Sequence, residues 1–240
     1  MQPCTGGGTL NTMTSQPSNS AKHIAQNSER SSSLTRFVWP GIGVLALIGV
    51  VILTVSVHAH GILAIDRAGY GFISARIISD SLTPVIRVVT KAASAVTLIT
   101  IAAVMLVVTS LRHRPRVGIA VALNLAFIAG INEIFKMIMQ RPRPNVPRLA
   151  VENGYSFPSG HAMASTAFYG FLIYLTYRYV HNRAAKWVII VLLALLVPTI
   201  MFTRVYLGVH YVSDVLAGCL CSIAWLTLVW VPIMKHTLLK

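Results

Sequence analysis

The sequence has few charged residues, and acidic residues are the scarcest among them. Charged residues make up 11% of the 240 positions, and only 6 are Asp or Glu against 20 Lys and Arg. A soluble globular protein carries about 25% charged residues. With 55% hydrophobic residues and a mean hydropathy of +0.69, this chain cannot cover a water-facing surface. We therefore expect it to reside in a lipid bilayer.

Cysteine is also scarce, with 3 in the chain, which excludes a disulfide framework. Cys4 lies in a polar segment, whereas Cys219 and Cys221 are two apart in an apolar run, where helical side chains do not face each other. No Cys-x-x-Cys pattern is present, and His58 and His60 have no nearby cysteine. The sequence thus predicts no metal site, and we expect no cofactor.

The formal net charge of +14 would suggest nucleic acid as the partner of a soluble protein. Here the basic residues lie between long apolar runs, so they favour a role in membrane orientation or in binding an anionic ligand. We expect the membrane itself as a partner and no nucleic acid.

The first 36 residues differ in composition from the rest of the chain. They are rich in Ser, Thr, Asn, Gln and Gly and are predicted to form a disordered polar tail, whereas residues 37–240 are predicted to form one membrane domain. The first apolar run, Phe37 to Val57, is too long for the apolar part of a cleaved signal and lacks a small-x-small end. We expect it to be retained as an anchor.

Six apolar runs approach the length of about 20 residues that a helix needs to cross a bilayer. They are Phe37–Val57, Ala92–Leu111, Val117–Phe135, Ala162–Tyr177, Trp187–Thr203 and Val215–Ile233. The sequence therefore predicts an all-α fold, a polytopic bundle of six transmembrane helices. Between the first two spans, residues Gly61 to Lys91 mix apolar and charged side chains, which favours helices lying at the membrane interface over a seventh span.

Six spans place both termini on one side of the membrane, and the short basic loops indicate which side. The loops at 112–116 and 178–186 are rich in Arg and Lys, and such loops stay in the cytoplasm. We therefore expect a multi-pass protein of the cell membrane with cytoplasmic termini. The opposite face, which carries the clusters described next, is expected to be extracytoplasmic.

Three clusters of basic, histidine and acidic residues fall at span ends on that opposite face. They are Lys136 with Arg143-Pro144, the segment Pro158-Ser159-Gly160-His161, and Arg204 with His210 and Asp214. Lysine and arginine side chains offer the charge and the N–H donors that a phosphate dianion needs. The segment at 158–161 is typical of a helix start, whose free N–H groups bind anions, and Gly160 lets a ligand approach the backbone closely.

The spacing of His210 and Asp214 favours nucleophilic chemistry. Residues four apart share one face of a helical turn, so the Asp214 carboxylate can accept the Nδ1 proton of His210 and leave Nε2 free to attack. His161 is then available as the acid that protonates a leaving oxygen.

Some basic residues in or near these clusters also have a simpler structural interpretation. Lys136 is at a helix end, where a basic side chain usually anchors the span by snorkelling to the interface, and Glu133 one turn earlier can simply pair with it. Arg141 and Arg148 are interpreted as general electrostatic contributors.

Together these residues resemble the motifs of the type 2 phosphatidic acid phosphatase superfamily of integral-membrane lipid phosphatases. The family motifs Lys-x6-Arg-Pro, Pro-Ser-Gly-His and Ser-Arg-x5-His-x3-Asp match here at 136–144, 158–161 and 203–214, with Thr203 where the family usually has Ser. The resemblance implies a metal-independent phosphatase in which His210 forms a phosphohistidine, Asp214 orients it, and His161 serves as acid and then as base. The phosphoryl oxygens would be held by Lys136, Arg143, Ser159, Gly160 and Arg204.

The stretch from Arg204 to His210 looks like that of bacterial members acting on undecaprenyl pyrophosphate or phosphatidylglycerophosphate. The resemblance therefore implies a lipid phosphate substrate, with undecaprenyl pyrophosphate first and phosphatidylglycerophosphate or phosphatidic acid next. A non-hydrolytic transporter or binder of anionic lipid head groups is the alternative, because charges within a membrane also mark transport paths. Against it, the spans contain few polar residues, with Asn124 and Asn132 as the main exceptions.

Overall fold

The computed structural model describes residues 19–237. The chain divides into two compact units, residues 1–38 and residues 39–240, and the account below concerns the second. The tail predicted at 1–36 falls partly on residues 1–18, which lie outside the described residues. Helix α1 (Asn19–His60) begins within the predicted tail. The boundary between tail and membrane domain at residue 36 stays a prediction.

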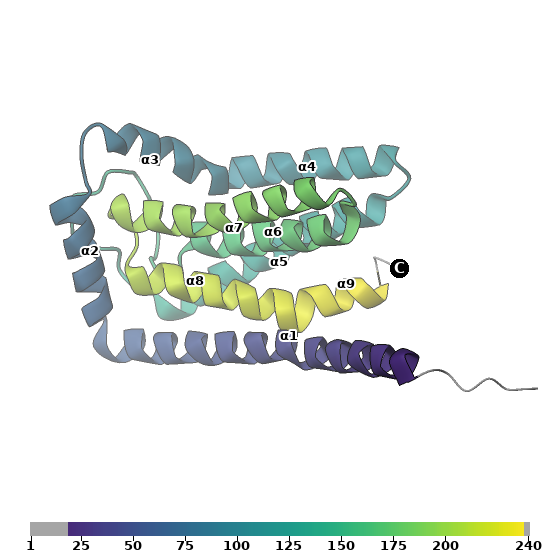
Figure 1. The fold of residues 1–240 in the computed structure, drawn as a ribbon. Coiled ribbons are helices and arrows are strands. Elements are labelled where there is room, and N and C mark those ends of the chain that lie inside the picture. Colours follow the sequence, from purple (N-terminus) through teal and green to yellow (C-terminus); the bar gives the residue numbers. More distant parts are fainter. Residues whose placement is uncertain (1–18, 238–240) are drawn as a thin grey trace, which may run out of the picture. The chain divides into compact units, whose positions relative to one another are not determined.

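All regular elements in the described part of the chain are helices, which confirms the all-α prediction. After α1, a short pair, α2 (Ala64–Arg76) and α3 (Leu82–Thr90), leads through a 3₁₀ turn, η1 (Lys91–Ala93), into the remaining helices (Figure 1). These are α4 (Ala95–Leu111), α5 (Pro115–Met139), α6 (Gly160–Tyr179), α7 (Arg183–Tyr206) and α8 (Val212–Ala224), which continues through the π-helical turn η2 (Trp225–Trp230) into α9 (Val231–Thr237).

Four helical segments of the described chain are long and apolar enough to cross a membrane. They are Val38–His60, Pro115–Met139, Arg183–Tyr206 and Val212–Lys235. A fifth is possible if Leu82–Ala93 and Ala95–Leu111, which meet at an angle of 44°, form one broken span. The sequence predicts six, and the sixth corresponds to α6, which does not meet the same criterion.

The position of α6 explains its lower hydropathy. It packs against α5, α7 and α8, and residues on all its sides are buried. A helix enclosed by other helices needs no lipid-facing apolar side chains, so it can include Ser165 and Thr166. The Ser165 hydroxyl donates to the Ala162 carbonyl at 3.2 Å. Asn124 of α5 donates to the α6 carbonyl of Ala167 at 2.9 Å and accepts from the indole of Trp225 at 2.9 Å.

The segment between the first two spans packs onto one end of the bundle. Ile73 of α2 and Ile86 of α3 join a buried cluster with Tyr206 at the end of α7. The Tyr206 hydroxyl receives the Ser79 backbone N–H at 3.1 Å and lies 3.0 Å from the Thr83 hydroxyl. Figure 1 shows α2 running across this end of the bundle, beside the start of α8. The predicted helices between spans one and two are therefore present and form one wall of the region described next.

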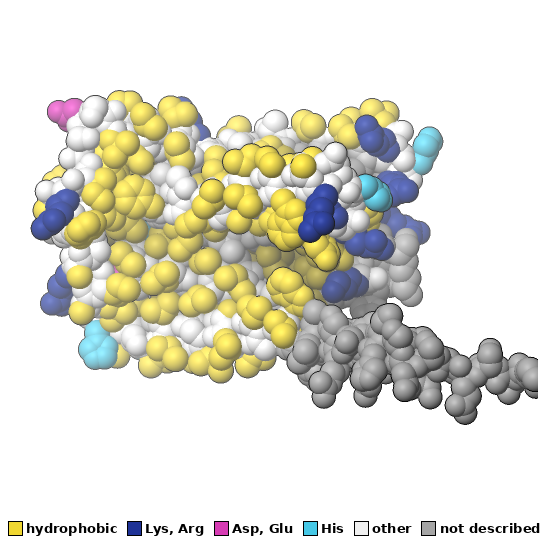
Figure 2. Space-filling model, in the orientation of Figure 1, with side chains coloured by type: hydrophobic (Ala, Val, Ile, Leu, Met, Phe, Trp, Pro, Cys, Tyr) yellow, Lys and Arg dark blue, Asp and Glu magenta, His cyan; other side chains and the backbone are white. Residues whose placement is uncertain are grey.

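The visible surface separates apolar and basic side chains. Figure 2 shows hydrophobic side chains over most of the face, with Lys and Arg gathered toward its two ends. Exposed large apolar residues include Leu45 and Ile52 in α1, Val96 in α4, and Leu192 and Leu195 in α7. An apolar surface of this extent is costly in water and suits the hydrocarbon core of a bilayer.

Candidate active site

Four helix ends and two loops meet at the end of the bundle that α2 crosses. The loop between α5 and α6 is held to the end of α7 by the Leu149 N–H, which donates to the Leu207 carbonyl at 3.0 Å. The Ser159 N–H donates to the Asp214 carbonyl at 3.1 Å, and Asn132 of α5 donates to the Pro158 carbonyl at 3.2 Å. These bonds bring the three sequence motifs together in space.

His210 lies in the short loop before α8 and is 3% exposed. Its Nδ1 is 2.9 Å from the Ser156 carbonyl oxygen and 3.4 Å from Asp214 Oδ2. A carbonyl only accepts, so Nδ1 carries the proton, and Nε2 is left as an acceptor. Arg143 Nη1 lies 3.3 Å from Nε2. The expected tautomer is therefore present, but the nearest acceptor is a backbone carbonyl, because α8 begins only at Val212 and His210 does not share a helical face with Asp214.

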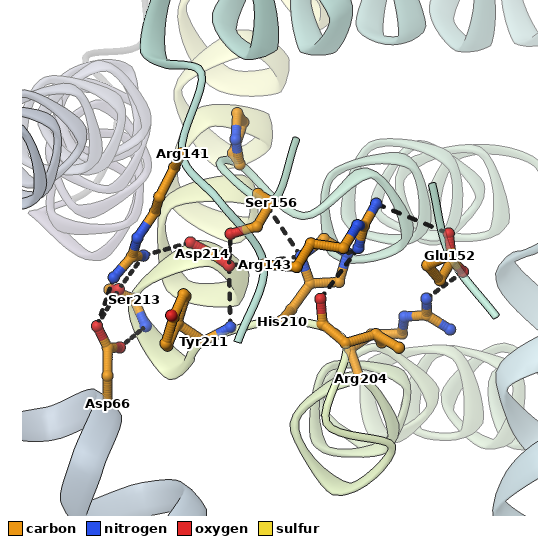
Figure 3. Close-up of polar contacts among 12 residues, drawn as sticks. Asp66, Arg141, Arg143, Glu152, Ser156, Arg204, His210, Tyr211, Ser213 and Asp214 are labelled. Atoms are coloured by element: carbon orange, nitrogen blue, oxygen red, sulfur yellow. Dashed lines mark hydrogen bonds and ion pairs between the residues drawn. The ribbon is translucent and has the colours of Figure 1, made fainter. Parts of the chain in front are cut away.

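Asp214 is fully buried and accepts from several donors. The Ser156 hydroxyl donates to Oδ2 at 2.7 Å, and the Tyr211 N–H donates to the same oxygen at 2.9 Å. Arg141 donates to Oδ1. Ser156 thus touches His210 through its carbonyl and Asp214 through its hydroxyl, and it joins the imidazole to the carboxylate (Figure 3).

Arg141 lies between two buried carboxylates. Besides Asp214, it donates to Asp66 Oδ2 at 2.7 Å and to the Gly61 carbonyl at 2.6 Å, and its guanidinium stacks over the Tyr211 ring at 4.0 Å. Asp66 in turn accepts from the Ser213 N–H at 2.8 Å and from the Ser213 hydroxyl at 2.9 Å. A buried charge is tolerated when it is paired and hydrogen-bonded, and this chain of contacts ties α2 to the start of α8.

A second group of charges lies on the other side of His210. Arg204, 1% exposed, donates through Nη2 to the Glu152 carboxylate and through Nη1 to the Thr90 hydroxyl at 2.9 Å. Arg143 donates to the carbonyls of Gly154, Val209 and Asn153 at 3.0, 3.0 and 2.7 Å. Glu152 is 3.9 Å from Arg143, so one carboxylate faces both guanidinium groups (Figure 3).

The start of α6 offers further donors. Ser159 precedes Gly160, the first residue of α6, and its hydroxyl is buried without a hydrogen-bond partner among the described residues, as is Nε of Arg204. A Cβ at Gly160 would lie 3.2 Å from Asn132 Oδ1 and 3.8 Å from Lys136 Nζ. Lys136 Nζ itself pairs with Glu133 at 3.0 Å. Unpaired buried donors beside a helix N-terminus are the groups an incoming anion would satisfy.

Burial and charge shift the titration of the groups in the loops and at the start of α6. Burial lowers the pKa of His210, although the Asp214 carboxylate acts in the opposite direction. Burial, followed by the charge of Arg204, lowers the pKa of His161 to about 3. Burial also lowers the pKa of Arg143. For Glu152, burial alone would raise the pKa, but the charge and hydrogen bond of Arg204 outweigh it and the net shift is downward. These shifts favour neutral imidazoles at His161 and His210 and an anionic Glu152.

The structure brings the sequence-predicted residues to one end of the bundle and adds others. Sequence reasoning missed Asp66, Glu152 and Ser156, and it gave Arg141 only a general electrostatic role. Arg141 carried a signal in being a second arginine two residues before Arg143. Thr203, in the place of the family serine, donates its hydroxyl to the Ile200 carbonyl of its own helix at 2.6 Å. Within residues 19–237, no three His, Cys, Asp or Glu side chains gather to hold a metal ion.

Known proteins match the part of the chain that carries the candidate active site. The family model described as the PAP2 superfamily matches residues 116–237. Phosphatidylglycerophosphatase B of Bacillus subtilis (strain 168) is 33% identical over 89 residues, which is 37% of this chain and 44% of the relative. Decaprenylphosphoryl-5-phosphoribose phosphatase of Mycolicibacterium smegmatis is 33% identical over 111 residues, 45% of this chain and 54% of the relative. The matched stretches thus span about half the length of these relatives.

A solved structure extends the likeness to most of the fold. The crystal structure of a transmembrane PAP2-type phosphatidylglycerolphosphate phosphatase from Bacillus subtilis superimposes with a TM-score of 0.74 at 22% sequence identity. The superposition covers 81% of this chain and 96% of that chain. At this identity the match concerns the fold, and it includes more of the chain than the family model does.

Proposed function

The chain belongs to the PAP2 superfamily, and on this premise we propose that it is an integral-membrane lipid phosphate phosphatase. The observation that carries the proposal is the arrangement around His210. Its Nε2 is an acceptor within a buried cluster that contains Arg143 and Arg204 and lies beside the start of α6. A neutral imidazole held among cations and N–H donors suits attack on a phosphoryl group.

In the proposed reaction, Nε2 of His210 attacks phosphorus as the P–O bond to the lipid breaks. His161 gives its proton to the departing oxygen, and the phosphoryl group stays on His210. Burial and the charge of Arg204 disfavour protonated His161, so the bound phosphate dianion would supply the opposite charge that raises the pKa of His161. Neutral His161 then takes a proton from water, which attacks phosphorus, breaks the N–P bond and releases phosphate.

Other side chains hold the reactants in place. Arg204, Arg143 and Lys136, with the Ser159 hydroxyl and the Gly160 backbone, would bind the phosphoryl oxygens, and positioning and electrostatic stabilisation would supply most of the rate enhancement. Glu152 now pairs with Arg204, so an incoming phosphate replaces or shares this contact. Asp66, Arg141 and Asp214 act on His210 through Ser156 and the loop before α8 and are positioning residues.

Undecaprenyl pyrophosphate is the substrate we propose first, followed by phosphatidylglycerophosphate and phosphatidic acid. The relatives named above are called phosphatidylglycerophosphatase and decaprenylphosphoryl-5-phosphoribose phosphatase, and a lipid phosphate is the chemistry they share. The apolar surface supports a substrate that keeps its tail in the bilayer. The helices α2 and α3 would lie at the interface and admit the head group.

We further propose six spans, with α6 as the enclosed fourth, cytoplasmic termini and an extracytoplasmic site. Hydrolysis is favoured over transport because the two asparagines within the predicted spans have structural partners. Asn124 bonds to Ala167 and Trp225, and Asn132 bonds to the Pro158 carbonyl at the site itself. Both amide N–H groups thus hold neighbouring elements of the bundle together.

The proposed function is tested by phosphate release from a panel of lipid phosphates by the purified chain in detergent with EDTA present. The panel comprises undecaprenyl pyrophosphate, phosphatidylglycerophosphate, phosphatidic acid and sphingosine phosphate. We expect turnover that persists in EDTA and is inhibited by vanadate, which mimics pentavalent phosphorus. Binding of these lipids without phosphate release would favour the transporter, and activity lost in EDTA and restored by a divalent cation would contradict the metal-independent scheme.

A further inference from the structure

A polar stripe on α3 and η1 faces a cavity beside the candidate active site. The stripe consists of Arg87, Thr90 and Lys91, which line the cavity. Ser94 lines it as well, but its hydroxyl caps α4 by accepting the Thr97 N–H at 3.2 Å. Residues three and four apart share one face of a helix. Apolar residues such as Val88 and Val89 occupy positions between them. Lipid contact alone gives no reason for three polar residues on this face, whereas a polar ligand in the cavity does.

The stripe is joined to the active site by direct contacts. The Thr90 hydroxyl accepts from Arg204 at 2.9 Å, and Arg87 donates through Nε to the Leu149 carbonyl at 2.9 Å. This second bond holds the Arg87 side chain to the α5–α6 loop and leaves its two terminal nitrogens available. His161 and Arg204 line the same cavity, which has a volume of about 450 Å³. A cavity of roughly 300–1,000 Å³ is typical of a ligand site.

Arg87 and Lys91 make no ion pair with an acid in the described part of the chain. Glu152 lines the same cavity, but it pairs with Arg204 and lies 3.9 Å from Arg143. In the described part of the chain, the ion pairs of the acids at 66, 133, 152 and 214 are made with other basic residues and with His210. No carboxylate lies within ion-pair distance of Arg87 or Lys91 in that part. Two cations four residues apart, on one wall of a cavity and without acidic partners, are suited to bind an anion.

The direction of the proposed reaction identifies that anion. His161 protonates the leaving oxygen and lines this cavity, so the leaving group departs into the space that Arg87 and Lys91 face. Resting on the proposed function, we propose that Arg87 and Lys91 form a second anion subsite. It takes the lipid-proximal phosphoryl group of a substrate that carries two phosphoryl groups.

Such a subsite would act in binding and in bond cleavage. When the terminal phosphate of a lipid diphosphate moves to His210, the lipid monophosphate departs with added negative charge, which adjacent cations stabilise. When the substrate is a lipid monophosphate, the leaving group is the lipid alcohol, which has no second phosphate to contact Arg87 or Lys91. Leu149, Ala150 and Leu207 line the cavity as well and provide an apolar surface for the first carbons of the chain.

The test compares a prenyl diphosphate with the prenyl monophosphate of the same chain. The purified full chain in mixed micelles is assayed as wild type, Arg87→Gln and Lys91→Gln. Arg76→Gln is the matched control, because Arg76 is an exposed arginine of neighbouring α2 that lies 5.8 Å from the Phe72 ring and does not line the cavity. We expect kcat/KM for the diphosphate to fall about tenfold or more in each subsite variant, and kcat/KM for the monophosphate to stay within about twofold.

Equal losses on the two substrates, or an equal loss in Arg76→Gln, would mean a general attraction of anionic lipid and would overturn the subsite. A wild-type chain that releases phosphate from neither lipid would instead contradict the proposed function. In that case binding decides the subsite, with inorganic pyrophosphate and phosphate as probes. The wild type should bind pyrophosphate about tenfold more tightly than phosphate, and both variants should bind the two anions about equally. A preference for pyrophosphate that is unchanged in the variants, or absent from the wild type, would overturn the proposal.

Discussion

At the residue scale, the state of His210 depends on neighbours far from it in sequence. The Ser156 carbonyl fixes the proton on Nδ1, and Arg143 lies against Nε2. Asp214 reaches the imidazole at 3.4 Å and bonds more closely to the Ser156 hydroxyl. Its main effect is therefore to hold Ser156 and the loop around His210, and Arg141 and Asp66 hold Asp214 in turn.

Asp66→Asn tests this chain of positioning contacts. The change leaves Arg141 with one fewer buried carboxylate, and breaking a buried ion pair costs about 3–5 kcal/mol of stability. We expect a lower unfolding temperature in detergent, and we expect kcat to fall much more than KM rises. Asp80→Asn is the control, because Asp80 is an exposed acid on the neighbouring turn. Wild-type kcat in Asp66→Asn would contradict the positioning role.

The pH dependence of activity should reflect the lowered pKa of His210. Burial disfavours the imidazolium, so the nucleophile stays neutral below its ordinary pKa of 6.5. We expect the NMR titration of ¹³C-labelled His210 to have its midpoint below 6.5. Because the Asp214 carboxylate raises this pKa, Asp214→Asn should move the midpoint further down while slowing turnover. A midpoint above 6.5 in the wild type would refute this account.

At the element scale, the beginning of α6 carries three of the candidate site residues, Ser159, Gly160 and His161. Gly160 opens this helix, and Lys136 Nζ of α5 lies 3.8 Å from the place of a Gly160 Cβ. The unpaired Ser159 hydroxyl lies at the same helix start. A side chain added at Gly160 would occupy space that the proposed phosphate needs.

Gly160→Ala should therefore weaken phosphate binding more than it affects folding. The added Cβ would lie 3.2 Å from Asn132 Oδ1, which the neighbouring side chain can relieve by a small shift. We expect KM and the vanadate inhibition constant to rise by about tenfold, as for the loss of a charge-assisted hydrogen bond. Gly130→Ala in α5 is the control, because its Cβ would meet nothing within 4 Å, and it should leave both constants unchanged.

The part of the site that sequence predicts is the part encoded at fixed spacing. Lys136, His161, Arg204 and Asp214 lie at helix ends, and once the spans are assigned their ends must meet. Asp66 reaches Arg141 across 75 positions and Ser213 across 147, and no periodic pattern specifies such pairs. The sequence predicts the run Ala162–Tyr177 as a span, but α6 is less apolar than the four candidate spans, because enclosure by other helices removes the need for high hydropathy.

At the scale of the whole molecule, the apolar surface and the basic ends determine how the chain sits in a membrane. The short loops at 112–116 and 178–182 lie at the helix ends opposite to those that form the site. The proposed topology places these basic loops in the cytoplasm and therefore predicts that the site is extracytoplasmic.

Thiol labelling tests this orientation. In a chain whose three cysteines are replaced, Asn153→Cys places a thiol in the α5–α6 loop near the site. We expect a membrane-impermeant maleimide to label it in intact cells. A cysteine at Arg114, in the loop opposite the site, should react only after permeabilisation. The reverse pattern would invert the topology.

The central claim, that His210 carries the phosphoryl group and His161 moves the protons, is tested by rapid-quench trapping with a ³²P-labelled lipid diphosphate. We expect an acid-labile labelled enzyme in the wild type. Its level should be higher in His161→Ala, because the phosphohistidine has lost its base for hydrolysis while phosphate, a good leaving group, still departs. His210→Ala should give neither label nor turnover. A labelled intermediate in His210→Ala, or its loss in His161→Ala with turnover retained in His210→Ala, would contradict the assignment.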